Sequence, residues 1–477
     1  MPSLRKTILW FQRDLRLSDH PALCHAAKRS EVVPVFVWED SPGPNSLGGA
    51  SKYWLHHSLR ALRAALEAHG VRLLLLRGDP LAAIPQLLDR VGADAIVWNR
   101  RYEPQAIATA TSLKAILTAR GIEAKSFKAG LLFEPWEIAN QQGNFFKVFT
   151  PFWKHCLAQS GQIGAPLGVP ALLPSTHSLP SEDLAGWNLL PTQPDWSGGL
   201  AAAWQPGESA AHQRLHAFLE NRLSTYAAKR DFPAIAATSS LSPHLHWGEI
   251  SPRQVWHAAR QAEALAGQHG SADKFLSELG WREFSYHLLF HAPSLPARPL
   301  NPKFQHFPWS DNPQFLRAWQ RGKTGYPLVD AGMRELWKTG YMHNRVRMIA
   351  ASFLTKHLLI DWRQGAAWFW DTLVDADLAN NSASWQWVAG CGADAAPYYR
   401  IFNPILQGQR FDPSGAYVRR WVPELSRLPD AYVHCPRETD EKTLKSAGLA
   451  LGKDYPLPII GHASARAAAL DAYKSLG

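Results

Sequence analysis

An acid, an aromatic ring and a cation share one predicted helix face in the segment ELGWREF. Glu278, Trp281 and Arg282 stand at positions i, i+3 and i+4, which are neighbours on a helix surface. Together they could bind a base and its phosphate. A surface helix with an internal ion pair is the alternative, and the segment alone does not exclude it.

A second segment, GYMHNRVRM (340–348), places an amide and a thioether one helical turn apart. Asn344 and Met348 could line a pocket for a flat apolar ligand, with Arg345 and Arg347 beside them. The alternative is a core methionine next to two solvated arginines.

Carboxylates and tryptophans alternate in VDADLANNSASWQWVAG (374–390). Because residues two apart do not share a helix face, Trp385 and Trp387 are predicted to point to different sides. Asp375 and Asp377 have no His or Cys at ligand spacing beside them, so no metal site is predicted. Helix caps and salt bridges are the alternative for the two carboxylates.

Hydroxyl groups gather before a predicted helix in TSSLSPHL (238–245). The hydroxyls of this segment and the N–H groups of a helix start suit a phosphate or pyrophosphate, and a capped turn is the alternative. Arg230 in RDFP and Arg400 in APYYRIFNP add cations in segments bounded by proline.

The composition indicates a globular protein with more than one core. The 477 residues are 46% hydrophobic and 19% charged, with a net charge of +10 that suits a polyanionic partner. The sequence has no apolar run of ~18 residues, so no membrane span is predicted. The N-terminus lacks a secretion signal. The four cysteines have no C-x-x-C spacing, which argues against zinc, an iron–sulfur cluster or disulfides and indicates the cytoplasm.

The pattern of elements changes along the chain. Apolar runs at 7–11, 32–38, 72–76 and 94–98 alternate with amphipathic stretches such as 53–70, which predicts a parallel α/β sheet in residues 1–130. No G-x-G-x-x-G follows the first strand. Residues 131–205, rich in Pro, Gly and Ser, are predicted to form a linker. Residues 206–477 are predicted to form an all-helical domain, with helical spacing at 211–230, 271–290 and 331–360.

These motifs, in this order, resemble those of the photolyase/cryptochrome flavoproteins over nearly the whole chain. The resemblance includes WFQRDLRLSDHPAL (10–23), TSSLSPHL, WREF, GYMHNRVRM and DLANNSASWQW. Within the family the sequence looks like a class I or class III cyclobutane pyrimidine dimer photolyase near the plant cryptochrome branch. The implied reaction is light-driven: reduced FAD gives an electron to a pyrimidine dimer flipped out of UV-damaged DNA.

The resemblance implies a role for each matching residue. Glu278 is expected to hydrogen-bond the dimer, Asn344 and Met348 to line its pocket, and Trp281 and Trp387 to contact the flipped bases. Histidines replace Asn344 and Met348 in six-four photolyases, which argues against six-four repair. Arg230, Arg282, Arg345, Arg400 and Gln407 match DNA-facing positions.

The cofactor contacts are implied in the same way. Asn381 matches the residue that faces flavin N5, where plant cryptochromes usually carry Asp. Ser240 replaces an arginine of some bacterial relatives. Trp385, Trp362 and Trp309 match the family's electron-transfer chain. The other FAD contacts are expected from Tyr226, Thr238, Ser239, Ser240, Leu241, Ser242, Phe275, Arg347, Asp375, Ala376 and Asp377.

The α/β region resembles the antenna domain of the family. Methenyltetrahydrofolate, with Glu103 as a contact, is the first expectation for the antenna; a deazaflavin or no antenna are the alternatives. A signalling cryptochrome without repair activity and a flavin electron-transfer protein are the competing functions. The full pocket set, and a chain that ends at Gly477 without a long tail, favour the photolyase. A monomer is expected.

Overall fold

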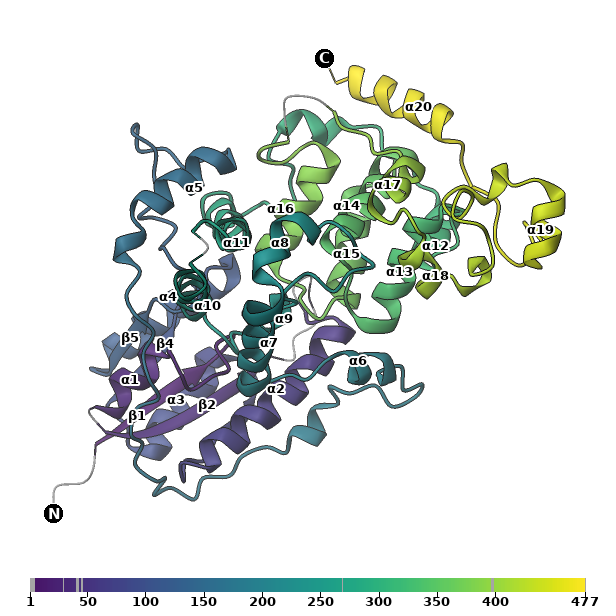
Figure 1. Ribbon diagram of the computed structural model, residues 1–477. Helices are drawn as coiled ribbons and strands as arrows, with labels where there is room; N and C mark the ends of the chain where they lie inside the picture. Colours follow the sequence, from purple (N-terminus) through teal and green to yellow (C-terminus); the bar gives the residue numbers. More distant parts are fainter. Residues whose placement is uncertain are drawn as a thin grey trace. The chain divides into compact units, whose positions relative to one another are not determined.

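The computed structural model describes residues 5–28, 30–39, 43, 46–267, 269–395 and 399–476. They divide into two compact units (Figure 1). The first unit holds residues up to Ser224 together with Ser239–Pro293, and the second holds Thr225–Thr238 together with the rest of the chain from Ser294. This division differs from the predicted domain borders, because residues 131–224 and 239–293 group with the sheet.

Five parallel strands form one sheet in the first unit, in the order β3-β2-β1-β4-β5. Four of them match the predicted strands within two residues. The fifth, EAKSF, lies at the sheet edge and has no buried residue, and its sequence carries no apolar run that could predict it. The strands are β1 (Lys6–Phe11), β2 (Glu31–Trp38), β3 (Leu74–Arg77), β4 (Ala95–Asn99) and β5 (Glu123–Phe127).

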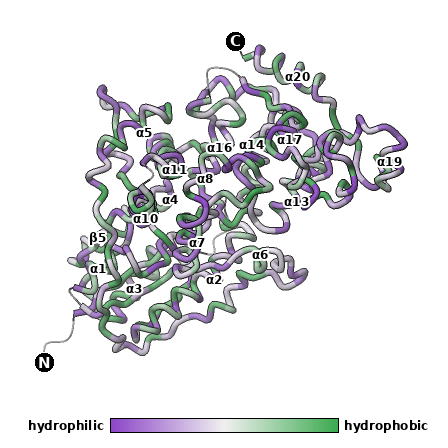
Figure 2. Tube along the Cα trace, in the orientation of Figure 1, coloured by the Kyte–Doolittle hydropathy of each residue, from purple (hydrophilic) through white to green (hydrophobic). Residues whose placement is uncertain are grey.

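Helices cover the sheet because its strands are apolar on both faces. Ile84 and Leu88 of α3 and Leu113 of α4 pack with Ile8 and Val35, which lie on one face of the sheet. The long helix α2 alternates hydrophobic and hydrophilic residues along its length (Figure 2). The helices of this region are α1 (Pro21–Ala27), α2 (Gly49–Glu67), α3 (Pro80–Val91) and α4 (Pro104–Ala119).

The predicted linker is partly helical and is bound along the sheet. Ser175 and Glu182 donate backbone hydrogen bonds to the carbonyls of Gly70 and Leu75, which covers the edge beside β3. The remaining helices up to residue 291 are α5 (Phe149–Ala158), α6 (Gly198–Ala203), α7 (Glu208–Asn221), α8 (Leu223–Lys229), α9 (Ser242–His246), α10 (Pro252–Leu265) and α11 (Asp273–His291).

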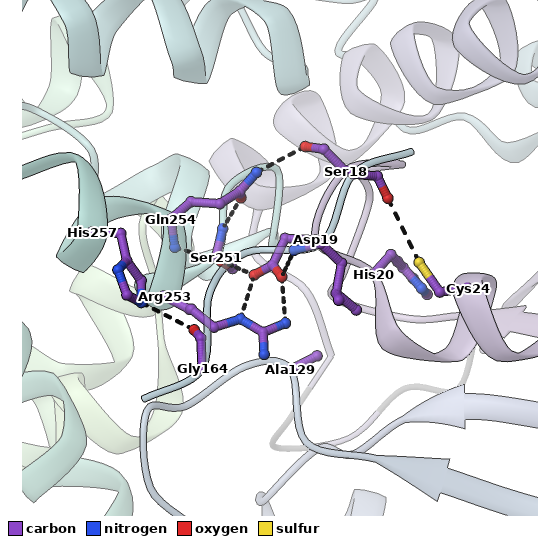
Figure 3. Close-up of polar contacts among 12 residues, drawn as sticks. Ser18, Asp19, His20, Cys24, Ala129, Gly164, Ser251, Arg253, Gln254 and His257 are labelled. Carbon is purple, nitrogen blue, oxygen red and sulfur yellow. Dashed lines mark hydrogen bonds and ion pairs between the residues drawn. The ribbon is translucent and has the colours of Figure 1, made fainter. Parts of the chain in front are cut away.

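A buried carboxylate joins the loop after β1 to α10 and to the linker. The oxygens of Asp19 accept hydrogen bonds from Ser251 Oγ at 2.5 Å and from Arg253 Nε at 3.0 Å (Figure 3). They also accept one from the Leu167 backbone N–H at 2.9 Å. The carbonyl of Asp19 also accepts from Arg16 Nη2 at 2.8 Å. This network explains why helices beyond residue 206 belong to the unit that contains the sheet.

Replacing Asp19 with Ala should strongly destabilise the first unit. The change leaves the Arg253 guanidinium without its carboxylate, and breaking such a pair costs about 3 kcal/mol. The urea midpoint of unfolding should fall accordingly. Asp79→Ala, which removes only the cap of α3, should cost about 1 kcal/mol. Equal losses in the two variants would contradict the role given to Asp19.

The second unit is helical. Its core is built around Trp319, Trp362 and Trp385, three buried indoles from three different helices. The helices are α12 (Pro313–Gln320), α13 (Pro327–Thr339), α14 (Asn344–Ser352), a π-helical turn (Phe353–His357), α15 (Trp362–Thr372), α16 (Leu378–Ala389), α17 (Pro404–Phe411), α18 (Ala416–Trp421), α19 (Glu441–Ala447) and α20 (His462–Lys474).

The helical stretch predicted at 331–360 is interrupted. Gly340 ends α13 in the left-handed conformation, with φ of 66°, and His343 caps α14 by accepting a hydrogen bond from the Arg345 backbone. The interruption sets the position of Asn344 at the first turn of α14. Within the described part of the chain, no helix is long and apolar enough to cross a membrane.

Candidate flavin and substrate site

A buried ion pair connects α14 to the segment before α16. Arg347 Nη2 donates to Asp375 Oδ2 at 2.9 Å, and Arg347 Nε donates to the Met342 carbonyl at 2.7 Å. Their side chains are 23% and 4% exposed. Burial works against the charge of Arg347, but the Asp375 carboxylate, together with Tyr341 and Glu335, outweighs it, and the pKa of the guanidinium is raised. The ion pair is fixed in position and presents both charges, so it can contact a polar heterocycle.

The first turn of α16 presents two of the predicted cofactor residues. Asp377 caps the helix by accepting from the Asn380 backbone at 2.8 Å. Asn381, one turn along, donates from Nδ2 to the Ala366 carbonyl at 3.0 Å. Its amide is therefore held in place by α15, and Ala376 is buried just before the helix.

Asn344 and Met348 are neighbours on α14, as their spacing predicts. Asn344 Nδ2 lies 3.9 Å from Met348 Sδ. Asn344 is exposed and Met348 is half-buried, so the amide and the thioether lie next to each other at the surface of the second unit. The alternative of a methionine buried in the core does not hold here.

Two of the predicted DNA-facing arginines flank one aspartate. Arg345 Nη2 lies 2.8 Å from Asp231 Oδ2, and Arg230 Nε lies 3.8 Å from Asp231 Oδ1. Arg345 also stacks over the Phe411 ring, and Arg230 over the Tyr226 ring. The carboxylate orders the two cations and neutralises part of their charge.

The two tryptophans of SASWQW point to different sides, which confirms the prediction from their spacing. Trp385 is 2% exposed and packs against Phe369, with ring centroids 5.0 Å apart. Trp387 is half-buried and donates from Nε1 to the Asp394 carbonyl at 3.1 Å. Arg400, which is exposed, lies over the Trp387 ring at 5.9 Å.

The three predicted electron-transfer tryptophans belong to one aromatic core. Trp385 and Trp362 are buried in it, and Trp309 packs against it while half-exposed. A Cβ added at Gly365 would lie 2.1 Å from the Trp385 ring, so glycine is required for α15 and α16 to approach this closely. The series runs from buried indoles to one that reaches the surface.

In the first unit, α11 carries the predicted acid and ring. Glu278 is 30% exposed, and its carboxylate lies 3.7 Å from Lys274 Nζ. Trp281 is half-buried and stacks face to face on Phe149. Arg282 is 13% exposed and donates to the Gly130 carbonyl at 2.7 Å. This placement suits a structural role for Arg282 better than contact with a phosphate.

The hydroxyl-rich segment forms a turn and a helix start, as predicted. Ser240 adopts the left-handed conformation, with φ of 52°, and α9 begins at Ser242. Ser239 is half-buried and Leu241 is buried, while Phe275 of α11 packs against Phe218. These residues lie in the first unit. The hydroxyl of Thr238, in the second, hydrogen-bonds Tyr341.

Glu103 lies just beyond β4, at the edge of the sheet where the carboxyl ends of the strands meet. Its carboxylate accepts from Arg101 Nη2 at 2.9 Å and lies 3.4 Å from Arg13 Nη1. At the same edge, Nε1 of Trp38 is buried with no hydrogen-bond partner among the described residues. A crevice at this edge, where strand order reverses beside β1, is the usual ligand position in such sheets.

Three residues that matter at these sites were not identified from the sequence. Asp231 orders two arginines, Gly365 makes room for Trp385, and Phe149 covers Trp281. Only Gly365 carried a signal, as a glycine inside an aromatic-rich helix. Gln407 is half-buried on α17. Among the described residues, no group of three or more His, Cys, Asp or Glu side chains is arranged to hold a metal ion.

Comparison with known proteins gives consistent matches. Residues 7–171 match the family described as DNA photolyase, and residues 275–475 match the FAD binding domain of DNA photolyase. A deoxyribodipyrimidine photo-lyase of Agrobacterium fabrum is 52% identical over 473 residues, which cover 98% of each chain. Cryptochrome-1 of Arabidopsis thaliana is 40% identical over 97% of this chain and 69% of its own. The crystal structure of a class III photolyase from Agrobacterium tumefaciens superposes with a TM-score of 0.96 at 50% identity, covering 100% of this chain and 98% of the other.

Proposed function

The chain belongs to the photolyase/cryptochrome family of flavoproteins, and from this premise we propose that it is a deoxyribodipyrimidine photo-lyase. It repairs UV-induced cyclobutane pyrimidine dimers in DNA with light. The observation that carries this proposal is the full-length identity of 52% to a photo-lyase, together with a helical unit whose residues fit a flavin.

The residues of the second unit suit FAD by their chemistry. The Arg347–Asp375 pair offers fixed charges of both signs. The Asn381 side chain is held by its hydrogen bond to the Ala366 carbonyl, and an amide, unlike a carboxyl group, cannot become anionic. We propose that these groups contact the isoalloxazine, with Ala376 and Asp377 beside it. Tyr226, Thr238 and residues 239–242, with Phe275, are proposed contacts of the phosphates and ribose. Bound FAD supplies the light absorption and the electron for ring splitting.

The proposed substrate contacts divide by chemistry. Glu278 hydrogen-bonds the dimer and stabilises the negative charge that forms on it. Trp281 and Trp387 offer aromatic faces for the flipped bases, and Asn344 and Met348 line the pocket wall. Arg230, Arg345, Arg400 and Gln407 are proposed to contact the DNA strand. Trp309, Trp362 and Trp385 are proposed to conduct electrons inward from the protein surface.

A cryptochrome-type photoreceptor without repair is the second candidate, since Arabidopsis cryptochrome-1 is 40% identical. Asn381, Glu278 and the neighbouring pair formed by Asn344 and Met348 favour repair. Light-dependent loss of a dimer from DNA separates the two functions, because a signalling cryptochrome would leave the dimer intact.

We also propose an antenna chromophore at the carboxyl edge of the sheet. The buried donor Trp38 Nε1 and the carboxylate Glu103 suit methenyltetrahydrofolate, with a deazaflavin as the alternative. The absorption spectrum of the purified holoprotein, before and after denaturation, identifies the chromophore. A monomer in the cytoplasm is the proposed state.

Replacing Glu278 with Ala should lower the quantum yield of repair by about one order of magnitude while FAD stays bound. The expected loss corresponds to one charge-assisted hydrogen bond of ~1.5 kcal/mol. Repair per absorbed photon at saturating enzyme is the measurement. Lys274→Ala, which removes the partner of Glu278 but keeps the carboxyl group, is the control. An unchanged yield in the Glu278 variant would remove the proposed role.

Binding of DNA should weaken steeply with salt, and the exposed Arg400 should account for part of the slope. Each phosphate contact contributes ~0.9 to the dependence of log K on log salt concentration. Arg400→Ala should therefore lower the slope by about 0.9. Arg282→Met, at a buried arginine bound to the Gly130 carbonyl, should leave the slope unchanged. A flat salt response of the wild type would exclude the arginine contacts altogether.

A further inference from the structure

We infer that Phe149 and Trp153 of α5 are positioning residues for Trp281, which fix its ring and leave one face for a substrate base. The inference rests on the proposed function, in which Trp281 contacts the flipped bases. It deepens that proposal by stating which residues orient this ring and which of its faces binds the base.

Three rings from two helices form a nearly parallel stack in the first unit. The rings of Phe149 and Trp281 have centroids 3.8 Å apart and planes 9° apart. The rings of Phe149 and Trp153 are 6.4 Å apart with an angle of 12°. Since Phe149 and Trp153 are one turn apart on α5, they present their rings on one face of the helix.

Two residues of α11, Gly280 and Phe284, make room for this stack and contact it. A Cβ added at Gly280 would lie 2.6 Å from two atoms of the Trp153 ring, so only glycine allows the two helices to approach here. Phe284, one turn after Trp281, closes the group edge-on, at 5.8 Å from Trp281 and 5.9 Å from Phe149. The ring of Trp281 is thus held by neighbours from both helices.

A face-to-face contact at 3.8 Å covers one face of the indole. A base can therefore stack only on the opposite face of Trp281. Because the Trp281 ring is already fixed in place, base binding carries no entropic cost of ordering it. Phe149 and Trp153 should act on the affinity for the dimer, not on the splitting of a dimer already bound. Base–aromatic stacking is also sequence-tolerant, which suits the recognition of any pyrimidine pair.

The test compares Phe149→Leu with Phe149→Tyr, which keeps the ring, in holoprotein labelled with 5-fluorotryptophan. The ¹⁹F resonance of Trp281 is identified by its loss in Trp281→Phe. In Phe149→Leu this resonance should shift or broaden, and affinity for a dimer-containing single strand should fall roughly fivefold to tenfold. Repair per photon at saturation and affinity for undamaged DNA should not change. Phe149→Tyr should match the wild type within about twofold.

Phe152→Leu is the matched control, since Phe152 lies on the same helix and packs against Phe284 and His287. It should lower stability but leave the Trp281 resonance and dimer affinity in place. If the Trp281 resonance does not move in Phe149→Leu, the inference is wrong. It is also wrong if the resonance moves but dimer affinity stays unchanged in Phe149→Leu, although Trp281→Ala weakens dimer binding. If Trp281→Ala leaves dimer affinity unchanged, the proposed role of Trp281 itself is wrong, and with it the inference.

Discussion

Replacing Trp385 with Phe should abolish the light-driven reduction of bound FAD and spare repair once the cofactor is reduced chemically. Trp385 is one of the two buried indoles of the proposed chain, and Phe is much harder to oxidise. The measurement is the loss of the oxidised flavin absorption band under blue light with an external reductant, followed by a repair assay after dithionite treatment.

The structure provides a control for this change. Trp319 is also buried and lies edge-on to Trp385 at 6.2 Å, but it is outside the proposed chain. Trp319→Phe should therefore keep photoreduction, although losing its hydrogen bond to the Ala350 carbonyl costs about 1 kcal/mol of stability. Photoreduction that survives in Trp385→Phe would show that another of the 21 tryptophans conducts the electron.

Breaking the Arg347–Asp375 pair should both destabilise the second unit and weaken FAD binding. Asp375→Asn leaves a mostly buried guanidinium without its counter-charge, a loss of about 3 kcal/mol. Arg347→Met should cost a similar amount, and the double variant should cost less than the sum of the two, because no unpaired charge remains. Urea unfolding of the apoprotein and flavin titration give the two quantities.

A more exposed pair in the same unit is the reference for this cycle. Arg334 and Glu424 pair at 2.8 Å. Arg334 is as exposed as Arg347, but the Glu424 carboxylate is 26% exposed whereas that of Asp375 is 4% exposed, so Arg334→Met leaves a carboxylate that water can reach. This variant should cost only ~1 kcal/mol without changing FAD affinity. If the Asp375 and Arg347 variants behave like Arg334→Met, the pair does not have the place in the flavin site that we assign to it.

Strong local patterns made most of the fold predictable from the sequence. Three buried strands and the half-buried β3 have continuous apolar runs, and Gly340 and the capping residues follow ordinary helix-end chemistry. The strand β5 was missed because it is polar and lies at the edge. The predicted linker was assigned by composition alone, so its helices and its hydrogen bonds to the sheet edge could not be predicted.

The candidate site shows a similar limit. Helical spacing was sufficient to predict that Asn344 and Met348 meet and that Trp385 and Trp387 diverge. It was not sufficient for contacts between elements far apart in the sequence. Phe149 lies 132 residues before Trp281 and shares no motif with it, so only the structure shows the stack. Arg282 matched a DNA-facing position by motif, but its hydrogen bond to Gly130 depends on how α11 packs.

The central claim is tested most directly by one assay. The reduced holoprotein is mixed with a thymine-dimer oligonucleotide, and the dimer is quantified by chromatography after blue light and in a parallel dark sample. The account predicts that intact thymines are restored in the light with multiple turnovers, and that the dark sample is unchanged. A dimer that binds and persists under light, while the flavin remains reduced and photoactive, would contradict the account and favour a photoreceptor without repair activity.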